Sequence, residues 1–182
     1  PEQKSPGSVS PEGHFACATN NGEITLAKYT KPGGSLTLRD GIEPLLADLA
    51  QETVIIPSTF NGLPVTGIGQ AAFQNCASLA GVTIPDCITS IADNAFRGCN
   101  GLTTLTIPRS VTSFCANAFA DCTKLVAIQV DTANPVYCSG EDGVVLSKDQ
   151  ATLVRYPSGR AGSYAVPDTV TNIGNDAFVG SR

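Results

Sequence analysis

Apolar positions recur every 23 residues through the middle of the chain. Phenylalanine, cysteine and leucine all keep this spacing, at Phe73, Phe96 and Phe119, at Cys76, Cys99 and Cys122, and at Leu79, Leu102 and Leu125. One such repeat cannot bury its apolar row alone, because the row has no second surface to pack against. Neighbouring repeats are therefore expected to stack into a solenoid.

Within each repeat, β-forming residues alternate with other residues just before the start of a bend. We predict short strands at 82–84, 105–107 and 128–130, paired in parallel on one sheet about 4.8 Å apart. Pro85 and Pro108 have no N–H group and are expected to end the ladder. The spacing thus predicts a right-handed leucine-rich-repeat solenoid of the α/β class, with mostly short parallel β-strands and short helical turns.

The repeated phenylalanines are expected to form a continuous inward spine. The residue before each repeated cysteine position is of a type that tolerates a positive φ, at Asn75, Gly98, Asp121 and Gly180. We predict a left-handed backbone at these positions, which closes each short helical turn.

The chain outside the core repeats divides into four segments. The opening, 1–13, is rich in Pro, Ser, Gly and Glu and is predicted to be a flexible leader. The rest, 14–182, is expected to be a single repeat domain: an N-terminal cap at 14–53, core repeats at 54–130, a β-hairpin insertion at 131–162 and a resumed repeat at 163–182.

Two hairpins are predicted within these segments. Asn20-Asn21-Gly22 favours a tight turn between strands at 15–19 and 23–29, and this hairpin would cap the open end of the solenoid. In the insertion, 144–146 and 152–154 flank a polar turn. Residues 42–50 are weakly helical in pattern.

The repeat from Leu79 to Cys99, Leu-x-x-Val-x-Ile-Pro-x-x-Ile-x-x-Ile-x-x-x-Ala-Phe-x-x-Cys, resembles the BspA-like, or Treponema-type, leucine-rich repeats. Asn134-Pro135-x-Tyr137 and Leu153-x-x-Tyr156-Pro157 are similar to a hairpin insertion common in that family. The resemblance covers about residues 14–182. It implies a bacterial surface or secreted protein without shared catalytic residues or a cofactor, and several such proteins are adhesins that bind host matrix or other cells.

Composition narrows the classes of partner. The net charge is −5, and residues 54–130 carry three acidic and three basic side chains, unlike the basic surface of a nucleic-acid binder. No apolar run reaches the roughly 18 residues of a transmembrane helix. The chain starts at Pro1 and contains no methionine, so we expect a removed signal peptide or an excised fragment, an extracellular or cell-surface location, and natural sequence beyond Arg182.

Catalytic and metal-binding residues are not predicted. The single histidine, His14, adjoins the leader, and no two cysteines have Cys-x-x-Cys spacing. Asp131, Glu141 and Asp142 could in principle converge, but acidic residues in loops are ordinarily solvated. We expect the repeated cysteines at 76, 99 and 122 to be buried free thiols, because in-register side chains project side by side and do not meet the dihedral angle of a disulfide.

Two surfaces are candidates for binding a protein or glycoprotein. Solenoids usually bind through their concave strands, whose outward residues include Thr83, Thr103, Thr104, Thr106 and Gln129. The hairpin insertion offers Tyr137, Arg155 and Tyr156, which are residue types common in interfaces. The predicted function is a non-catalytic surface or secreted binding module, for example an adhesin for host matrix, mucus or other cells. A structural spacer of a larger surface protein and an accessory domain of a secreted enzyme are the alternatives.

Overall fold

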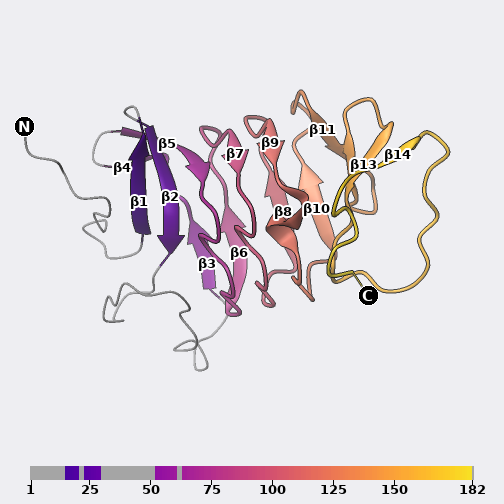
Figure 1. Cartoon of the computed structure of the whole chain (residues 1–182), viewed down its shortest axis with the longest axis horizontal. Helices are drawn as coiled ribbons and strands as arrows, with labels where there is room; N and C mark the ends of the chain where they lie inside the picture. Colours follow the sequence, from indigo (N-terminus) through magenta and orange to yellow (C-terminus); the bar gives the residue numbers. More distant parts are fainter. Residues whose placement is uncertain (1–14, 21–22, 30–51, 61–62, 182) are drawn as a thin grey trace, which may run out of the picture.

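The computed structural model describes residues 15–20, 23–29, 52–60 and 63–181. Its strands follow one another along the long axis of the molecule, from β1 near one end to β14 near the other (Figure 1). The predicted leader and the weakly helical segment 42–50 lie outside these residues. The elements are β1 (Phe15–Asn20), β2 (Glu23–Tyr29), β3 (Glu52–Ile55), β4 (Thr59–Phe60), β5 (Leu63–Ile68), β6 (Leu79–Thr83), β7 (Ser90–Ile91), β8 (Thr104–Ile107), β9 (Ser113–Phe114), the 3₁₀ helix η1 (Ala116–Phe119), β10 (Ala127–Val130), β11 (Tyr137–Ser139), β12 (Val145–Ser147), β13 (Thr152–Arg155) and β14 (Asn172–Ile173).

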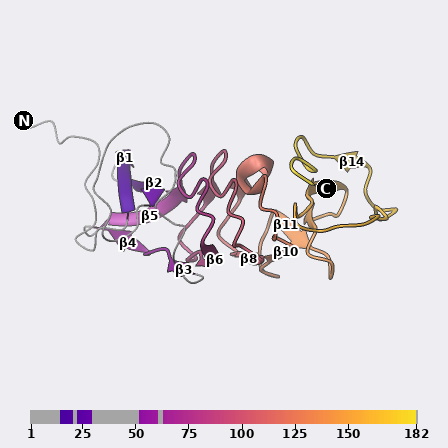
Figure 2. The same ribbon diagram turned by 90° about the horizontal axis from the view of Figure 1, so that it is seen from below.

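Parallel strands build two sides of the molecule. On one side, β2, β5, β7 and β9 pair in parallel in this order. On the other, β3 pairs in parallel with β6, and β8 with β10. Figure 2 shows β3, β6, β8 and β10 in succession along one side of the molecule. Each repeat thus supplies one rung, and the predicted solenoid is confirmed. The first, second and third rungs carry Phe73, Phe96 and Phe119, and the last rung carries Phe178.

The three predicted strands exist, but they do not form one sheet. They correspond to β6, β8 and β10, and Ala127 lies opposite Thr104, one repeat of 23 residues away. In the described part of the chain, no ladder joins β6 to β8. The Asp131 N–H donates to the Ile107 carbonyl oxygen at 2.9 Å, whereas Pro108, one rung earlier, has no N–H to donate. The prediction of a single sheet was wrong at this point.

The phenylalanine spine is present as predicted. The rings of Phe73 and Phe96 stack with centroids 4.9 Å apart and planes 4° from parallel, and those of Phe96 and Phe119 with centroids 5.6 Å apart at 10°. All three side chains are fully buried. Backbone bonds tie the same rungs together, since Phe73 N donates to Ala95 O at 2.7 Å and Phe96 N to Ala118 O at 2.8 Å.

The turns carry the predicted left-handed residues but little helix. The φ angles are 60° at Asn75, 73° at Gly98, 58° at Asp121 and 72° at Gly180. Among the described residues, only η1 is helical. The other rungs reverse direction through short turns, such as the one closed by the hydrogen bond from Arg97 N to Asn94 O at 3.0 Å. The helical turns were therefore overpredicted, because a few residues are enough to reverse a rung and too few to close an α-helical bond.

The N-terminal hairpin is confirmed, and its pairing shows how it meets the solenoid. β1 and β2 are antiparallel, with Asn20 opposite Glu23, and β2 then pairs in parallel with β5. The Asn21-Gly22 pair lies outside the described residues. The hairpin therefore continues the sheet of the first rung at its edge, where a solenoid needs a cap.

The insertion contains the predicted hairpin and one strand more. β12 and β13 are antiparallel, and β11, which the sequence analysis missed, pairs with β12. β13 then pairs in parallel with β14, with Leu153 opposite Ile173. Tyr156 N donates to Ala177 O at 2.8 Å, and this bond is equivalent to the one that Phe96 N makes to Ala118 O. The end of the insertion thus takes the place of a rung.

Candidate binding face

The candidate strand face is exposed as predicted. On β8, Thr104 and Thr106 are exposed, while Leu105 and Ile107 alternate with them and are buried. This alternation follows from the two-residue period of a strand, which sends neighbouring side chains to opposite sides. All the predicted face residues point to solvent: Thr83, Thr103, Thr104, Thr106 and Gln129.

The register aligns these residues into a row. Thr106 lies opposite Gln129, and Thr83 lies opposite Ile55, whose side chain is 72% exposed. The sequence analysis did not single out Ile55, although it alternates with the buried Val54 and Ile56. The face therefore combines hydroxyl and amide groups, which donate and accept hydrogen bonds, with an apolar residue at its N-terminal edge.

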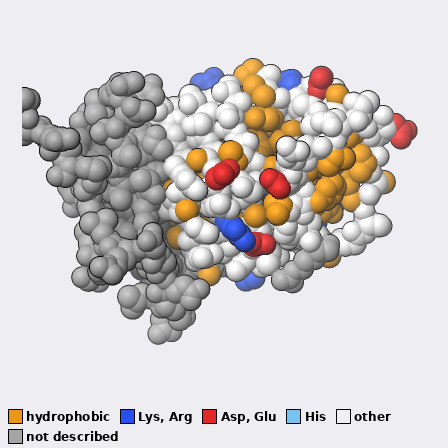
Figure 3. Space-filling model, viewed as in Figure 1, with side chains coloured by type: hydrophobic (Ala, Val, Ile, Leu, Met, Phe, Trp, Pro, Cys, Tyr) orange, Lys and Arg blue, Asp and Glu red, His pale blue; other side chains and the backbone are white. Residues whose placement is uncertain are grey.

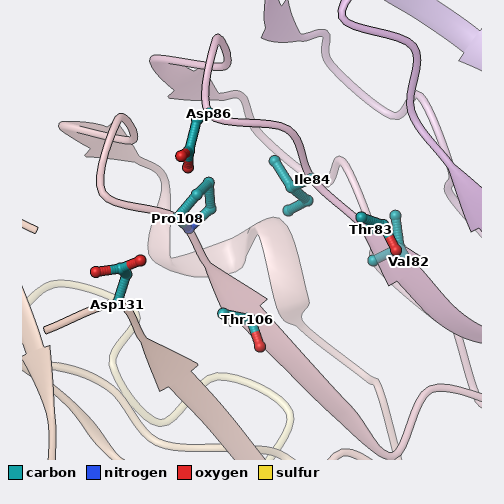
Figure 4. A pocket seen from close by; sticks show the side chains of 7 residues that line it. All are labelled: Val82, Thr83, Ile84, Asp86, Thr106, Pro108 and Asp131. Carbon is teal, nitrogen blue, oxygen red and sulfur yellow. The ribbon is translucent and has the colours of Figure 1, made fainter. Parts of the chain in front are cut away.

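A hollow of about 300 Å³ opens at the C-terminal ends of β6 and β8. It lies at the interruption between these two strands, because its walls come from both. Figure 4 shows Asp86 and Asp131 on opposite sides of Pro108. The lining residues are Val82, Thr83, Ile84, Asp86, Thr106, Pro108 and Asp131.

The two carboxylates of the hollow have different partners. Asp86 forms an ion pair with Arg109, in which Asp86 Oδ2 lies 3.1 Å from Arg109 Nε, and both side chains are more than half exposed. Asp131 Oδ1 accepts the Ala133 N–H at 2.8 Å. Within the described residues, Asp131 makes no ion pair. Charge at the hollow is therefore negative at Asp131 and nearly compensated at Asp86.

The insertion residues proposed as contacts are mostly internal. Arg155 is completely buried and Tyr156 is 4% exposed, so neither side chain presents the exposed surface that the predicted binding hairpin assumed. Burial lowers the pKa of Arg155 to about 10, which still leaves it protonated at neutral pH. Its guanidinium donates to the carbonyl oxygens of Phe119, Asp176 and Val179 at 2.9, 3.0 and 2.9 Å and to Ser158 Oγ at 2.6 Å.

Tyr137 is half-buried and also packs inward. Its ring lies 4.9 Å from that of Phe114, its hydroxyl donates to Thr112 O at 3.4 Å, and burial raises its pKa. Beside it, the buried Asn134 donates to Pro108 O and Val111 O at 2.9 Å each. Its Oδ1 accepts the N–H groups of Val136 and Tyr137. Asn134 thus fixes the start of the insertion to the third rung.

None of the three repeated cysteines forms a disulfide bond, and Cys99 and Cys122 are buried. Cys99 Sγ donates to Phe73 O at 3.1 Å and Cys122 Sγ to Phe96 O at 3.0 Å. Burial raises the pKa of Cys99 well above its usual range and that of Cys122 to about 11. Cys76 is only half-buried, so its predicted burial was too complete. The thiols of Cys99 and Cys122 are therefore poor nucleophiles in the folded protein.

The residues that the structure describes contain no group of three or more His, Cys, Asp or Glu side chains arranged to hold a metal ion. They also contain no helix that is long and apolar enough to cross a membrane.

A second exposed apolar set lies on the last rung. Figure 3 shows hydrophobic side chains gathered toward the C-terminal end of the face in view. The exposed fractions are 41% for Val166, 47% for Ile173, 40% for Phe178 and 37% for Val179. The first three occupy repeat positions that are buried in the second and third rungs, which have a neighbour on each side.

The family model described as a BspA type leucine rich repeat region (6 copies) matches residues 50–137. This match covers the rungs that carry the phenylalanine spine and the candidate face. Residues 50–137 of the chain carry repeats of the BspA-type leucine-rich repeat family. This family is typical of bacterial surface proteins. No curated protein matches the sequence.

Three solved structures of bacterial proteins are similar to this chain in fold. The pneumococcal vaccine antigen PcpA is 29% identical with a TM-score of 0.60, over 70% of this chain and 31% of that protein. A leucine rich cell surface protein from Faecalibacterium prausnitzii is 34% identical with a TM-score of 0.58, over 71% of this chain and 33% of that protein. A leucine-rich repeat protein from Bacteroides ovatus, 23% identical with a TM-score of 0.51 over 91% of this chain and 37% of that one, shows the same fold. The chain spans about a third of the length of these solved proteins.

Proposed function

We propose that this chain is a non-catalytic, protein-binding module of a bacterial cell-surface or secreted protein, which contacts a host matrix protein, a mucus glycoprotein or another cell through its strand face. The observation that carries this proposal is the exposed row on β6, β8 and β10. The strands hold its hydroxyl and amide groups at fixed spacing, so binding loses little conformational entropy.

The chemistry of the face supports a protein or glycoprotein partner. Thr83, Thr104, Thr106 and Gln129 offer neutral donors and acceptors, and Ile55 adds an exposed apolar side chain. Such a mixed surface suits amide and sugar hydroxyl groups, and it lacks the positive charge that a nucleic acid requires. The likeness to a leucine rich cell surface protein from Faecalibacterium prausnitzii supports the proposed location.

The test uses the purified chain against immobilised host matrix proteins and mucin. We expect saturable binding to at least one of them, and we expect Thr104→Arg and Gln129→Arg to weaken it at least about tenfold, because a bulky side chain at an interface centre prevents close packing. Biolayer interferometry measures both. Neither residue lines the hollow.

The matched control places the same bulk on the other side of the solenoid. Ser90 is an exposed residue of β7, and Ser90→Arg should leave binding unchanged. Circular dichroism checks that all three variants remain folded. Binding that is lost equally in Ser90→Arg, or retained in both face variants, would assign the interface to another surface.

A further inference from the structure

We propose that the hollow at the ends of β6 and β8 receives a lysine side chain of the protein partner. This inference rests on the proposed function, because the hollow adjoins the strand face and shares Thr83 and Thr106 with it. It adds a chemical class of ligand at one defined position of that face: an alkyl chain that ends in a primary ammonium group.

The hollow exists because the strand ladder is interrupted there. β3 pairs with β6 and β8 with β10, but no ladder joins β6 to β8 within the described chain. Pro108 has no N–H at the position from which Asp131 closes the neighbouring ladder. The volume of about 300 Å³ lies at the lower end of the range for ligand sites, which suits one long side chain.

Its lining has an apolar part and a negative part. Val82, Ile84 and Pro108 provide carbon surface, along which the methylene groups of a lysine can lie. Asp86 and Asp131 stand on opposite sides of Pro108 (Figure 4), and a terminal ammonium group would lie beside Asp131, which has no ion-pair partner among the described residues. Thr83 and Thr106 also line the hollow, where it adjoins the strand face.

The partners of the carboxylates favour ammonium over guanidinium. Arg109 already contacts Asp86 Oδ2, and the Ala133 N–H already contacts Asp131 Oδ1. Among the described residues, one oxygen of each carboxylate has no further partner, and these two oxygens belong to separate side chains. A planar guanidinium prefers both oxygens of one carboxylate, whereas a compact ammonium can contact oxygens from several directions. A metal ion is a poorer match, because no set of three His, Cys, Asp or Glu side chains forms here or elsewhere among the described residues.

The experiment titrates the isotopically labelled chain with three small probes, followed by amide NMR signals. Nα-acetyl-lysine methylamide carries the proposed group, the norleucine analogue has an uncharged stem, and the arginine analogue carries guanidinium. We expect the lysine probe to shift the amides of Thr83, Thr106 and Asp131 and to bind about fivefold more tightly than norleucine, as a partly solvated charge contact provides. The arginine probe should bind more weakly than lysine.

Asp131→Asn should remove most of this preference, because the amide oxygen can still accept the Ala133 N–H while the charge is lost. Asp168→Asn removes the same charge at an exposed site outside the hollow and should change nothing. Equal binding of lysine and norleucine, tighter binding of arginine, or an unaltered preference in Asp131→Asn would overturn the proposal. If Thr104→Arg abolishes matrix binding but the lysine probe does not affect that binding, the proposed function would stand and the lysine site would be rejected.

Discussion

The third rung and the last rung carry the same apolar pattern with different burial. Phe119 is fully buried and Phe178 is 40% exposed, although each follows the proline of its own rung by 11 residues. Phe114 is 8% exposed, and Ile173 at the equivalent position is 47% exposed. The third rung is covered on both sides, whereas the described chain covers only one side of the last. The repeat pattern thus determines which residues point inward, and the neighbouring rungs determine how much stability each inward residue contributes.

The largest expected difference separates the two phenylalanine environments. Phe96→Ala in the second rung should lower the free energy of unfolding by about 3–5 kcal/mol, because it leaves a cavity between two stacked rings. Phe178→Ala should cost about 1–2 kcal/mol, because its ring is partly in water already. Urea denaturation measures both. Equal losses would show that the last rung is as well packed as the inner ones.

Arg155→Met should lower the free energy of unfolding by about 2–4 kcal/mol, because buried acceptors on two rungs lose a charged donor. The effect should concentrate on the last rung. Hydrogen exchange is expected to accelerate more at the Tyr156 amide, which bonds Ala177, than at the Phe96 amide. Uniform acceleration at both amides would contradict a local role.

The control for this variant is Arg97→Met. Arg97 pairs with Asp121 at 2.9 Å, but both side chains are about half exposed. An ion pair in that setting is worth at most about 1 kcal/mol. Its loss should therefore leave the Tyr156 amide nearly as protected as before.

Because its thiol is buried, Cys122 should make the folded protein less stable at alkaline pH. The pKa of Cys122 is raised to about 11 in the folded protein, against 9.0 for a solvent-exposed thiol, so between these pH values the unfolded state loses the proton first. Stability from this group is complete below pH 9 and should fall by about 2 kcal/mol as pH approaches 11. Cys122→Ala should flatten that part of the stability–pH curve relative to Cys87→Ala. Parallel curves would contradict the assignment.

In the smallest expected effect, a substitution in the last rung should cost more stability than the same substitution in the second rung. Gly98 and Gly180 share the left-handed conformation, which costs an alanine about 1 kcal/mol in either rung. A Cβ at Gly180 would also lie 2.6 Å from the backbone nitrogen of Asp121, whereas at Gly98 it would meet the exposed Asn75 side chain, which can move. Gly180→Ala should therefore cost about 1 kcal/mol more than Gly98→Ala. Thermal unfolding compares them, and a larger cost at Gly98 would contradict the proposed crowding.

The candidate face could be predicted from sequence because strand alternation is local. Thr104 and Thr106 flank an inward leucine, and that period alone sends them outward. The insertion could not be predicted in the same way. Tyr and Arg are common in interfaces, but Arg155 and Tyr156 are also suited to replacing a rung, and composition does not distinguish the two uses.

The repeat period determined the solenoid, the phenylalanine spine and the left-handed positions, because each depends on residue type and spacing within one rung. Only the tertiary structure decided where the ladder breaks, how the insertion rebuilds a rung and which carboxylates line the hollow. Asp86 and Asp131 are 45 residues apart in sequence and reach the same hollow only because the rungs stack. Neither the stacking partner of a rung nor the inter-rung hydrogen bond that a missing N–H removes can be read from a single repeat, since both are properties of two rungs in contact.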